Sequence, residues 1–128
     1  MEMHEVSMEV NSRTFRVSYS LLENAVVAFF FEDRMRIGTL AIAMPGTGEV
    51  AVGRSSVLVG GKYLMTSRAL AERLAGESGR IALVSFFTEL DEAEAFRVYA
   101  KLLEKVKLGK QSAVKSLRPD ASIRQNIG

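Results

Sequence analysis

The sequence predicts an α+β fold, an antiparallel β-sandwich of about six to seven strands with two helices packed to one side. In the first 60 residues, short apolar segments alternate with polar or glycine-rich breaks, which is typical of strands joined by tight turns. After Gly61 the pattern changes to a helix, one further strand and a long helix. A run of strands followed by helices favours an antiparallel sheet or sandwich with its helices on one side.

Two alternating segments open the chain. Residues 3–10 place Val6, Met8 and Val10 on one side, and residues 13–19 repeat the same period of two. Because only Asn11-Ser12 separates them, we expect a β-hairpin, with its turn type left open.

The middle of the chain predicts strands of a different kind. Residues 24–31 (NAVVAFFF) form a continuous apolar run, which indicates a strand buried on both faces. In residues 34–44 the alternation shifts phase across Gly38-Thr39, which predicts a β-bulge or a close backbone contact. A strong turn signal at residues 45–48 separates this segment from short strands at 49–53 and 56–59.

The remaining elements are a helix, a strand and a helix. Residues 67–74 have helical spacing, with Thr66 or Ser67 as the N-cap and Gly76 or Gly79 as the stop. Residues 80–87 form a strand. Residues 91–108 form the long helix, whose apolar residues cover an arc of roughly 200°, about twice what packing on one sheet requires. We expect either two layers of its own domain or a second chain to cover that surface.

Composition separates a domain at 1–109 from a basic tail at 110–128. The tail has four basic residues and one acidic residue, Asp120, so its charge is +3. Since the whole chain has a net charge of +2, residues 1–109 carry −1. The tail suits solubility, docking to an acidic protein patch or contact with nucleic acid phosphates, and four charges are a weak signal for the last. The absence of cysteine excludes disulfides and thiolate chemistry. Scarce cysteine, asparagine and glutamine fit a thermophile.

The sequence contains no catalytic or cofactor-binding constellation. His4 is the only histidine, and we expect it to be a surface residue, because one histidine cannot supply the usual catalytic or metal-ligand cluster. The segment Gly46-Thr47-Gly48 lacks the lysine and the helix of a phosphate-binding loop. No apolar run spans a membrane, and acidic residues stand where a signal peptide is basic, so a cytoplasmic protein without membrane contact is expected.

The stretch from Phe15 to Val106 resembles the small proteasome assembly chaperones of types three and four, as an archaeal-like homologue. Five segments carry the resemblance: residues 25–30 (AVVAFF), 35–40 (MRIGTL), 56–60 (SVLVG), 69–75 (ALAERLA) and 81–85 (IALVS). The resemblance implies a dimer of like or related subunits, no catalysis, no cofactor, and proteasome α-type subunits as partners during α-ring assembly. The chain ends in Asn126-Ile127-Gly128, without the tyrosine-containing tripeptide by which the larger chaperones of that pathway dock.

We assign two surfaces on this basis. One stripe of the long helix, Phe96, Tyr99, Ala100 and Leu103, is expected to cover the sheet of its own domain. The adjacent stripe is expected to meet an identical chain in a homodimer: Ala95, Val98, Leu102 and Val106. The client-binding loop is expected between residues 45 and 54, with Pro45, Gly46, Thr47, Gly48 and Arg54.

The leading hypothesis is therefore a non-enzymatic, dimeric chaperone for α-ring assembly. The alternatives are a dimeric scaffold or regulatory module with unrelated protein clients, and a nucleic-acid accessory protein that acts through the basic tail.

Overall fold

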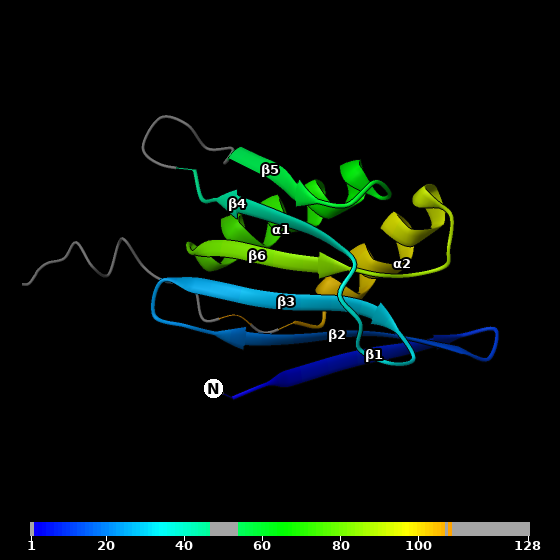
Figure 1. Cartoon of the computed structure of the whole chain (residues 1–128). Coiled ribbons are helices and arrows are strands. Elements are labelled where there is room, and N and C mark those ends of the chain that lie inside the picture. The colour runs from blue at the N-terminus through cyan, green and yellow to red at the C-terminus, as the bar shows by residue number, and fades with distance from the viewer. Residues whose placement is uncertain (1, 47–53, 107, 109–128) are drawn as a thin grey trace, which may run out of the picture.

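A computed structural model describes residues 2–46, 54–106 and 108 (Figure 1). It contains six strands and two helices. They are β1 (His4–Val10), β2 (Arg13–Leu21), β3 (Ala25–Glu32), β4 (Thr39–Met44), β5 (Arg54–Val59), α1 (Leu64–Ser78), β6 (Ile81–Phe86) and α2 (Glu92–Leu103). The predicted strand at 49–53 and the predicted tail at 110–128 lie outside the described residues.

The strands form a single six-stranded sheet in the order β1-β2-β3-β6-β4-β5. Every neighbouring pair is antiparallel except β3 and β6, which run parallel. The predicted α+β class with two helices on one side is confirmed. The sheet is mixed and forms one layer, so among the described residues the second layer consists of helices rather than of a second sheet. The parallel pair arises because β6 enters between β3 and β4, after the crossover through α1.

The N-terminal hairpin is confirmed, and its turn type is now defined. β1 and β2 pair from His4↔Tyr19 to Val10↔Arg13, which leaves the two residues Asn11 and Ser12 in the turn. Both have positive φ, 51° and 65°. Two left-handed residues make a type I′ turn, whose twist matches that of the flanking strands.

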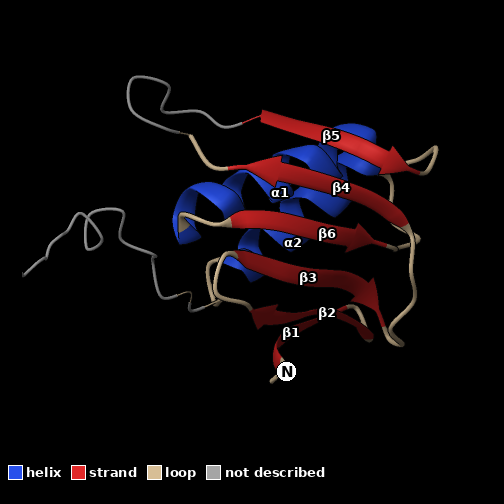
Figure 2. Cartoon of the chain, turned by 60° about the vertical axis from the view of Figure 1, so that its left-hand side comes forward, coloured by secondary structure: helices blue, strands red, loops and turns tan. Residues whose placement is uncertain are grey.

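Both helices cover the same face of the sheet (Figure 2). α1 packs on β4, β5 and β6, and α2 packs on β1 and β2 beside it. The core between the layers is apolar and aromatic. Tyr99 of α2 sits at its centre, with its ring centroid 5.0–5.9 Å from those of Phe15, Phe30 and Phe86 in edge-to-face or near edge-to-face geometry. Burial raises the pKa of the Tyr99 hydroxyl, so this side chain stays neutral at physiological pH.

Both ends of α1 lie outside the predicted segment 67–74, although one of the two predicted stop glycines, Gly79, does end the helix. The helix begins at Leu64, three residues earlier than predicted, so Thr66 and Ser67 lie inside it and neither is the N-cap. The cap position belongs to Tyr63, which has left-handed backbone geometry and no capping side chain. Gly79 ends the helix with φ 69° and donates its N–H to the carbonyl of Ala75, as predicted for a glycine stop.

α2, the predicted long helix, is shorter than expected: it ends at Leu103 rather than near residue 108. Its N-cap is Asp91, whose carboxylate accepts a hydrogen bond from the Glu94 N–H at 2.8 Å. The predicted irregularity near Gly38 is a close backbone contact: a Cβ there would lie 2.2 Å from the carbonyl oxygen of Phe86. The β-bulge itself falls further along, between Leu40 and Ala41.

We predict that Gly60→Ala destabilises the fold strongly, whereas Gly61→Ala does not. Gly60 has φ +123°, and an added Cβ would lie 2.5 Å from Oγ1 and 2.8 Å from Cα of Thr39. Backbone strain and overpacking together are expected to lower the free energy of unfolding by about 2–4 kcal/mol. A Cβ at Gly61 meets nothing within 4 Å, so its alanine variant should stay within about 1 kcal/mol of wild type. Urea unfolding checks both, and equal effects would contradict the prediction.

Candidate interaction surfaces

The structure places the predicted helix stripes differently from their assignment. Ala95 and Leu102 have no exposed surface, because they face the sheet of their own chain. Their assignment to a partner surface is therefore corrected. Val98 and Val106 are half-buried and pack against the same core. Phe96, which was assigned to the sheet, is 44% exposed instead.

The predicted client-binding loop is described only at its two ends. Pro45 and Gly46 are half-buried where β4 ends, and Arg54 is exposed at the start of β5. Thr47 and Gly48 lie outside the described residues. The two described ends lie beside each other, since Met44 pairs with Arg54 across the β4–β5 ladder.

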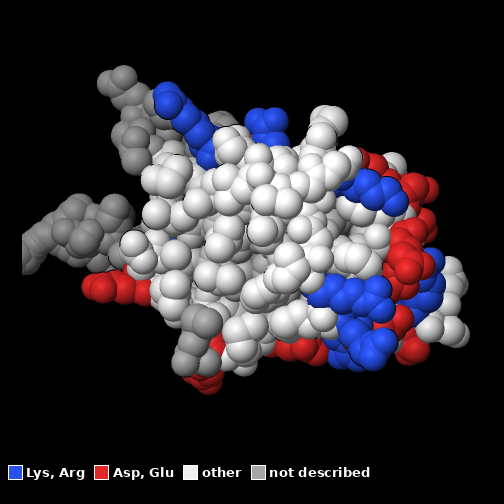
Figure 3. All heavy atoms as spheres, in the orientation of Figure 1, with Lys and Arg blue, Asp and Glu red and all other residues white. Residues whose placement is uncertain are grey.

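The central part of the sheet face opposite the helices, on β3, β4 and β6, is largely apolar, and the described part of the chain leaves much of it uncovered. Most residues of β3, β4 and β6 that alternate with the core residues point to this side and are partly or largely exposed, whereas Phe31 and Ser85, which also alternate with the core, are buried. The larger residues among those exposed are Val27 and Phe29 on β3, Leu40, Ile42 and Met44 on β4, and Ile81 and Leu83 on β6. None of them carries a charge. Figure 3 views the molecule from this side, and its Lys, Arg, Asp and Glu side chains lie around the margin of an uncharged centre.

This open face was missed by the sequence analysis, although its signal is present in the sequence. The run at residues 24–31 was interpreted as a strand buried on both faces. In the structure, Val26, Ala28 and Phe30 face the helices and are buried, whereas Val27 and Phe29 face outward and are only half-buried. An apolar strand with one uncovered face indicates a surface that another molecule covers.

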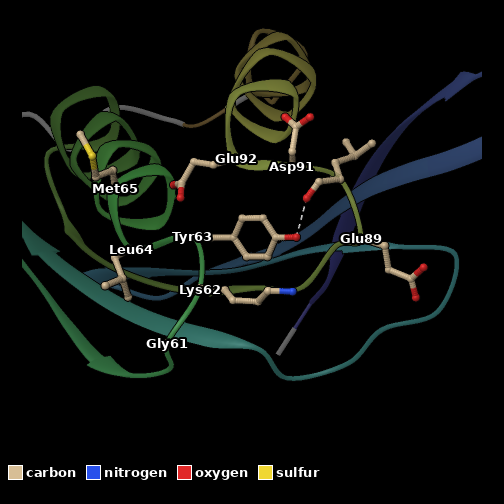
Figure 4. Close-up of a pocket in the computed structure, with 9 residues that line it drawn as sticks. Gly61, Lys62, Tyr63, Leu64, Met65, Glu89, Asp91 and Glu92 are labelled. Carbon is tan, nitrogen blue, oxygen red and sulfur yellow. Dashed lines mark hydrogen bonds between the residues drawn. The ribbon is translucent and has the colours of Figure 1, made fainter.

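A groove lies at one end of the molecule, where both helices begin. It consists of a cavity of about 660 Å³ and a second of about 410 Å³, which share four lining residues. The shared residues are Gly61, Lys62, Tyr63 and Glu89. Figure 4 shows the first cavity, with Lys62 extended below the Tyr63 ring and the acidic residues Asp91 and Glu92 on the opposite wall.

Hydrogen bonds between the two helix starts hold this groove in shape. The Tyr63 hydroxyl lies 2.8 Å from the carbonyl oxygen of Thr88 and 2.5 Å from that of Leu90. Burial raises the pKa of this hydroxyl, which therefore remains a donor. The Thr66 N–H donates to the Glu92 carboxylate at 2.8 Å, so a side chain of α2 caps the otherwise uncapped start of α1.

A second polar cluster ties the β3 end to the β6–α2 connection. The Glu32 carboxylate accepts hydrogen bonds from Arg13 at 2.6 and 3.0 Å. It also accepts one from the Thr88 hydroxyl at 3.2 Å and one from the Glu89 N–H at 3.4 Å. The Arg13 hydrogen bonds lower the pKa of the Glu32 carboxyl below its ordinary value of 4.5, against the opposing effect of partial burial.

We predict that Glu32→Gln destabilises the fold at neutral pH and that the difference from wild type disappears in acid. A lowered folded-state pKa means that ionised Glu32 contributes stability above its unfolded pKa, and that this contribution is lost as the pH falls through the folded value. Urea unfolding from pH 7 down to acid checks this. Glu77→Gln, at the exposed ion pair with Arg73, is the control and should change little at any pH. A Glu32→Gln effect that persists unchanged in acid would contradict the prediction.

The described residues contain no cluster typical of a metal site. Across residues 2–46, 54–106 and 108, no group of three or more His, Cys, Asp or Glu side chains gathers closely enough to hold a metal ion. His4 is exposed as predicted, with its ring centroid 5.3 Å from that of Tyr19. Neither helix in this part of the chain is long and apolar enough to cross a membrane.

Comparison with known proteins identifies a similar fold. No family model matches the chain, and no curated protein matches it. Among solved structures, it is similar to a chain from the crystal structure of a chaperone complex for yeast 20S proteasome assembly, with a TM-score of 0.59 and 13% sequence identity. The match covers 82% of this chain and 92% of the yeast chain. The fold is therefore shared with a proteasome assembly chaperone.

Proposed function

We propose that this protein is a non-enzymatic, cytoplasmic, dimeric chaperone that assists the assembly of proteasome α-subunits into the α-ring. The observation that carries the proposal is the fold shared with the yeast chaperone complex, because it extends over 92% of that chain. Five short segments that resemble the type three and type four chaperones support it. Four of them lie largely on β3, β5, α1 and β6, and residues 35–40 run from the β3–β4 connection into the start of β4.

We infer that the dimer is a homodimer formed by the open face of the sheet. A contiguous exposed apolar patch of this kind indicates an interaction site. Since the centre of the face carries no charge, an identical face is a suitable partner: a two-fold axis would place apolar surface on apolar surface without burying an unpaired ion. Two sheets packed in this way form a sandwich about 10 Å thick, with the helices on its outer sides.

The client contact is proposed to lie at the Pro45–Arg54 loop. Pro45 and Gly46 follow β4, and Arg54 is the exposed first residue of β5, beside the open face. An exposed cation next to an apolar surface suits an acidic patch on a client subunit. We expect Arg54→Glu to weaken client binding by about fivefold, the scale of one exposed charge pair. Arg97→Glu, an equal charge change at an exposed position of α2, should leave binding unchanged in the same titration.

Binding to purified proteasome subunits of the same organism tests the function. The immobilised chain should retain α-type subunits and should not retain β-type subunits. The scaffold alternative predicts that neither class is retained. Equal retention of both classes, or of neither, would overturn the proposal.

A further inference from the structure

The basic C-terminal segment at 110–128 has no role in the function proposed above. Its charge of +3 results from Lys110, Lys115, Arg118 and Arg124 against Asp120. Three apolar residues, Val114, Leu117 and Ile123, each directly precede one of these basic residues. We propose that this segment docks into the groove between the starts of α1 and α2 of the same chain.

The charge of the groove complements that of the segment. Its first cavity is lined by three acidic residues, Glu89, Asp91 and Glu92, against the single cation Lys62, a net −2. The structure fixes Asp91 and Glu92, because each accepts a hydrogen bond from a helix N-terminal N–H. Glu89 is exposed, and within the described residues its carboxylate accepts no hydrogen bond. It is therefore available to a lysine or arginine side chain.

The groove also offers apolar contacts at its rim. Met65 is 78% exposed, Ile37 63% and Leu64 43%, which places three of the large exposed apolar side chains around one groove. The floor is the ring of Tyr63, whose hydroxyl is already hydrogen-bonded to backbone carbonyls. An apolar side chain flanked by cations, such as Leu117 beside Arg118, suits a site with an apolar rim and acidic walls.

The length of the segment permits this docking. α2 begins at the groove and runs away from it for 12 residues, which is about 18 Å. The 19 residues from 110 to 128 span up to about 60 Å when extended. Attachment to the same chain gives the segment a local concentration on the order of mM, so a weak interaction is sufficient for substantial occupancy.

Paramagnetic relaxation in the full-length protein tests the proposal. The chain lacks cysteine, so Met65→Cys carries a single nitroxide label at the groove. Leu22→Cys, 40% exposed in the β2–β3 turn at the opposite end of the sheet, is the matched control (Figure 1). We expect the label at 65 to reduce the amide signals of residues 110–128 by about twofold or more, and to reduce them more than the label at 22 does.

A charge variant tests the electrostatic part. Glu89→Lys at the groove should restore the lost amide signals, whereas Glu23→Lys, the same change in the β2–β3 turn, should not. Equal relaxation from both label positions would overturn the proposal, as would insensitivity to Glu89→Lys. Relaxation that appears only between labelled and isotope-labelled molecules in a mixture would assign the groove to the segment of a second copy and would also overturn it. The readout requires this chain alone, so its result is independent of proteasome subunit binding.

Discussion

Replacement of Leu102 by alanine is expected to lower the free energy of unfolding by about 2–5 kcal/mol, as for other large buried side chains. Leu102 is fully buried between α2 and the sheet, beside Tyr99 and Leu103. The cost combines the lost burial of its methyl groups with the cavity that remains, since the packed aromatic rings around it cannot collapse fully.

Phe96→Ala provides the matched control on the same helix. Phe96 is 44% exposed, so its loss should cost less than about 1 kcal/mol. Urea unfolding at two protein concentrations measures both variants and separates fold stability from dimer stability. If the two variants were equally destabilised, or if Leu102→Ala lost its dimer while keeping wild-type monomer stability, the placement of α2 would be wrong.

The second large effect is expected at the open face of the sheet. Ile42→Lys should convert the proposed homodimer into folded monomers, with a dissociation constant raised about a hundredfold or more. Ile42 pairs with Leu83 near the middle of the face, so a two-fold interface would bury one unpaired ammonium group from each chain. In the monomer the same lysine can reach water, and the fold should persist.

Phe96→Lys introduces the same charge at an exposed apolar position of the helical layer and should leave the dimer intact. Light scattering gives the mass of each variant, and circular dichroism reports its fold. A dimeric Ile42→Lys, or a wild-type chain that is monomeric at high concentration, would contradict the proposed interface.

Much of the fold was predictable because it depends on local signals. The hairpin around Asn11-Ser12 follows from two alternating segments with a two-residue break. The helix stop at Gly79 follows from the freedom of glycine at positive φ. The position of β6 between β3 and β4 was not predictable from local signals. It depends on where in the sheet the chain re-enters after the α1 crossover, and the residues of β6 itself do not specify that place.

The interaction surfaces were less predictable for a related reason. The wide apolar arc of the predicted helix was interpreted as more surface than one sheet covers, but the helix wheel does not show which residues the sheet covers. The structure buries residues from both predicted stripes, including Ala95 and Tyr99, and leaves Phe96 exposed. The apolar surface that remains exposed lies on the sheet, on Val27, Phe29 and their neighbours. The sequence pattern indicated that these residues are buried, but it did not show which element or molecule covers them.

Reconstitution of the α-ring measures the central claim most directly. Purified α-type subunits would be mixed with and without this protein, and native mass spectrometry would follow the appearance of complete rings over time. The proposed function predicts that rings form faster in its presence, through an intermediate that contains the chain together with α-subunits. Ring formation at an unchanged rate, without any such intermediate, would contradict it.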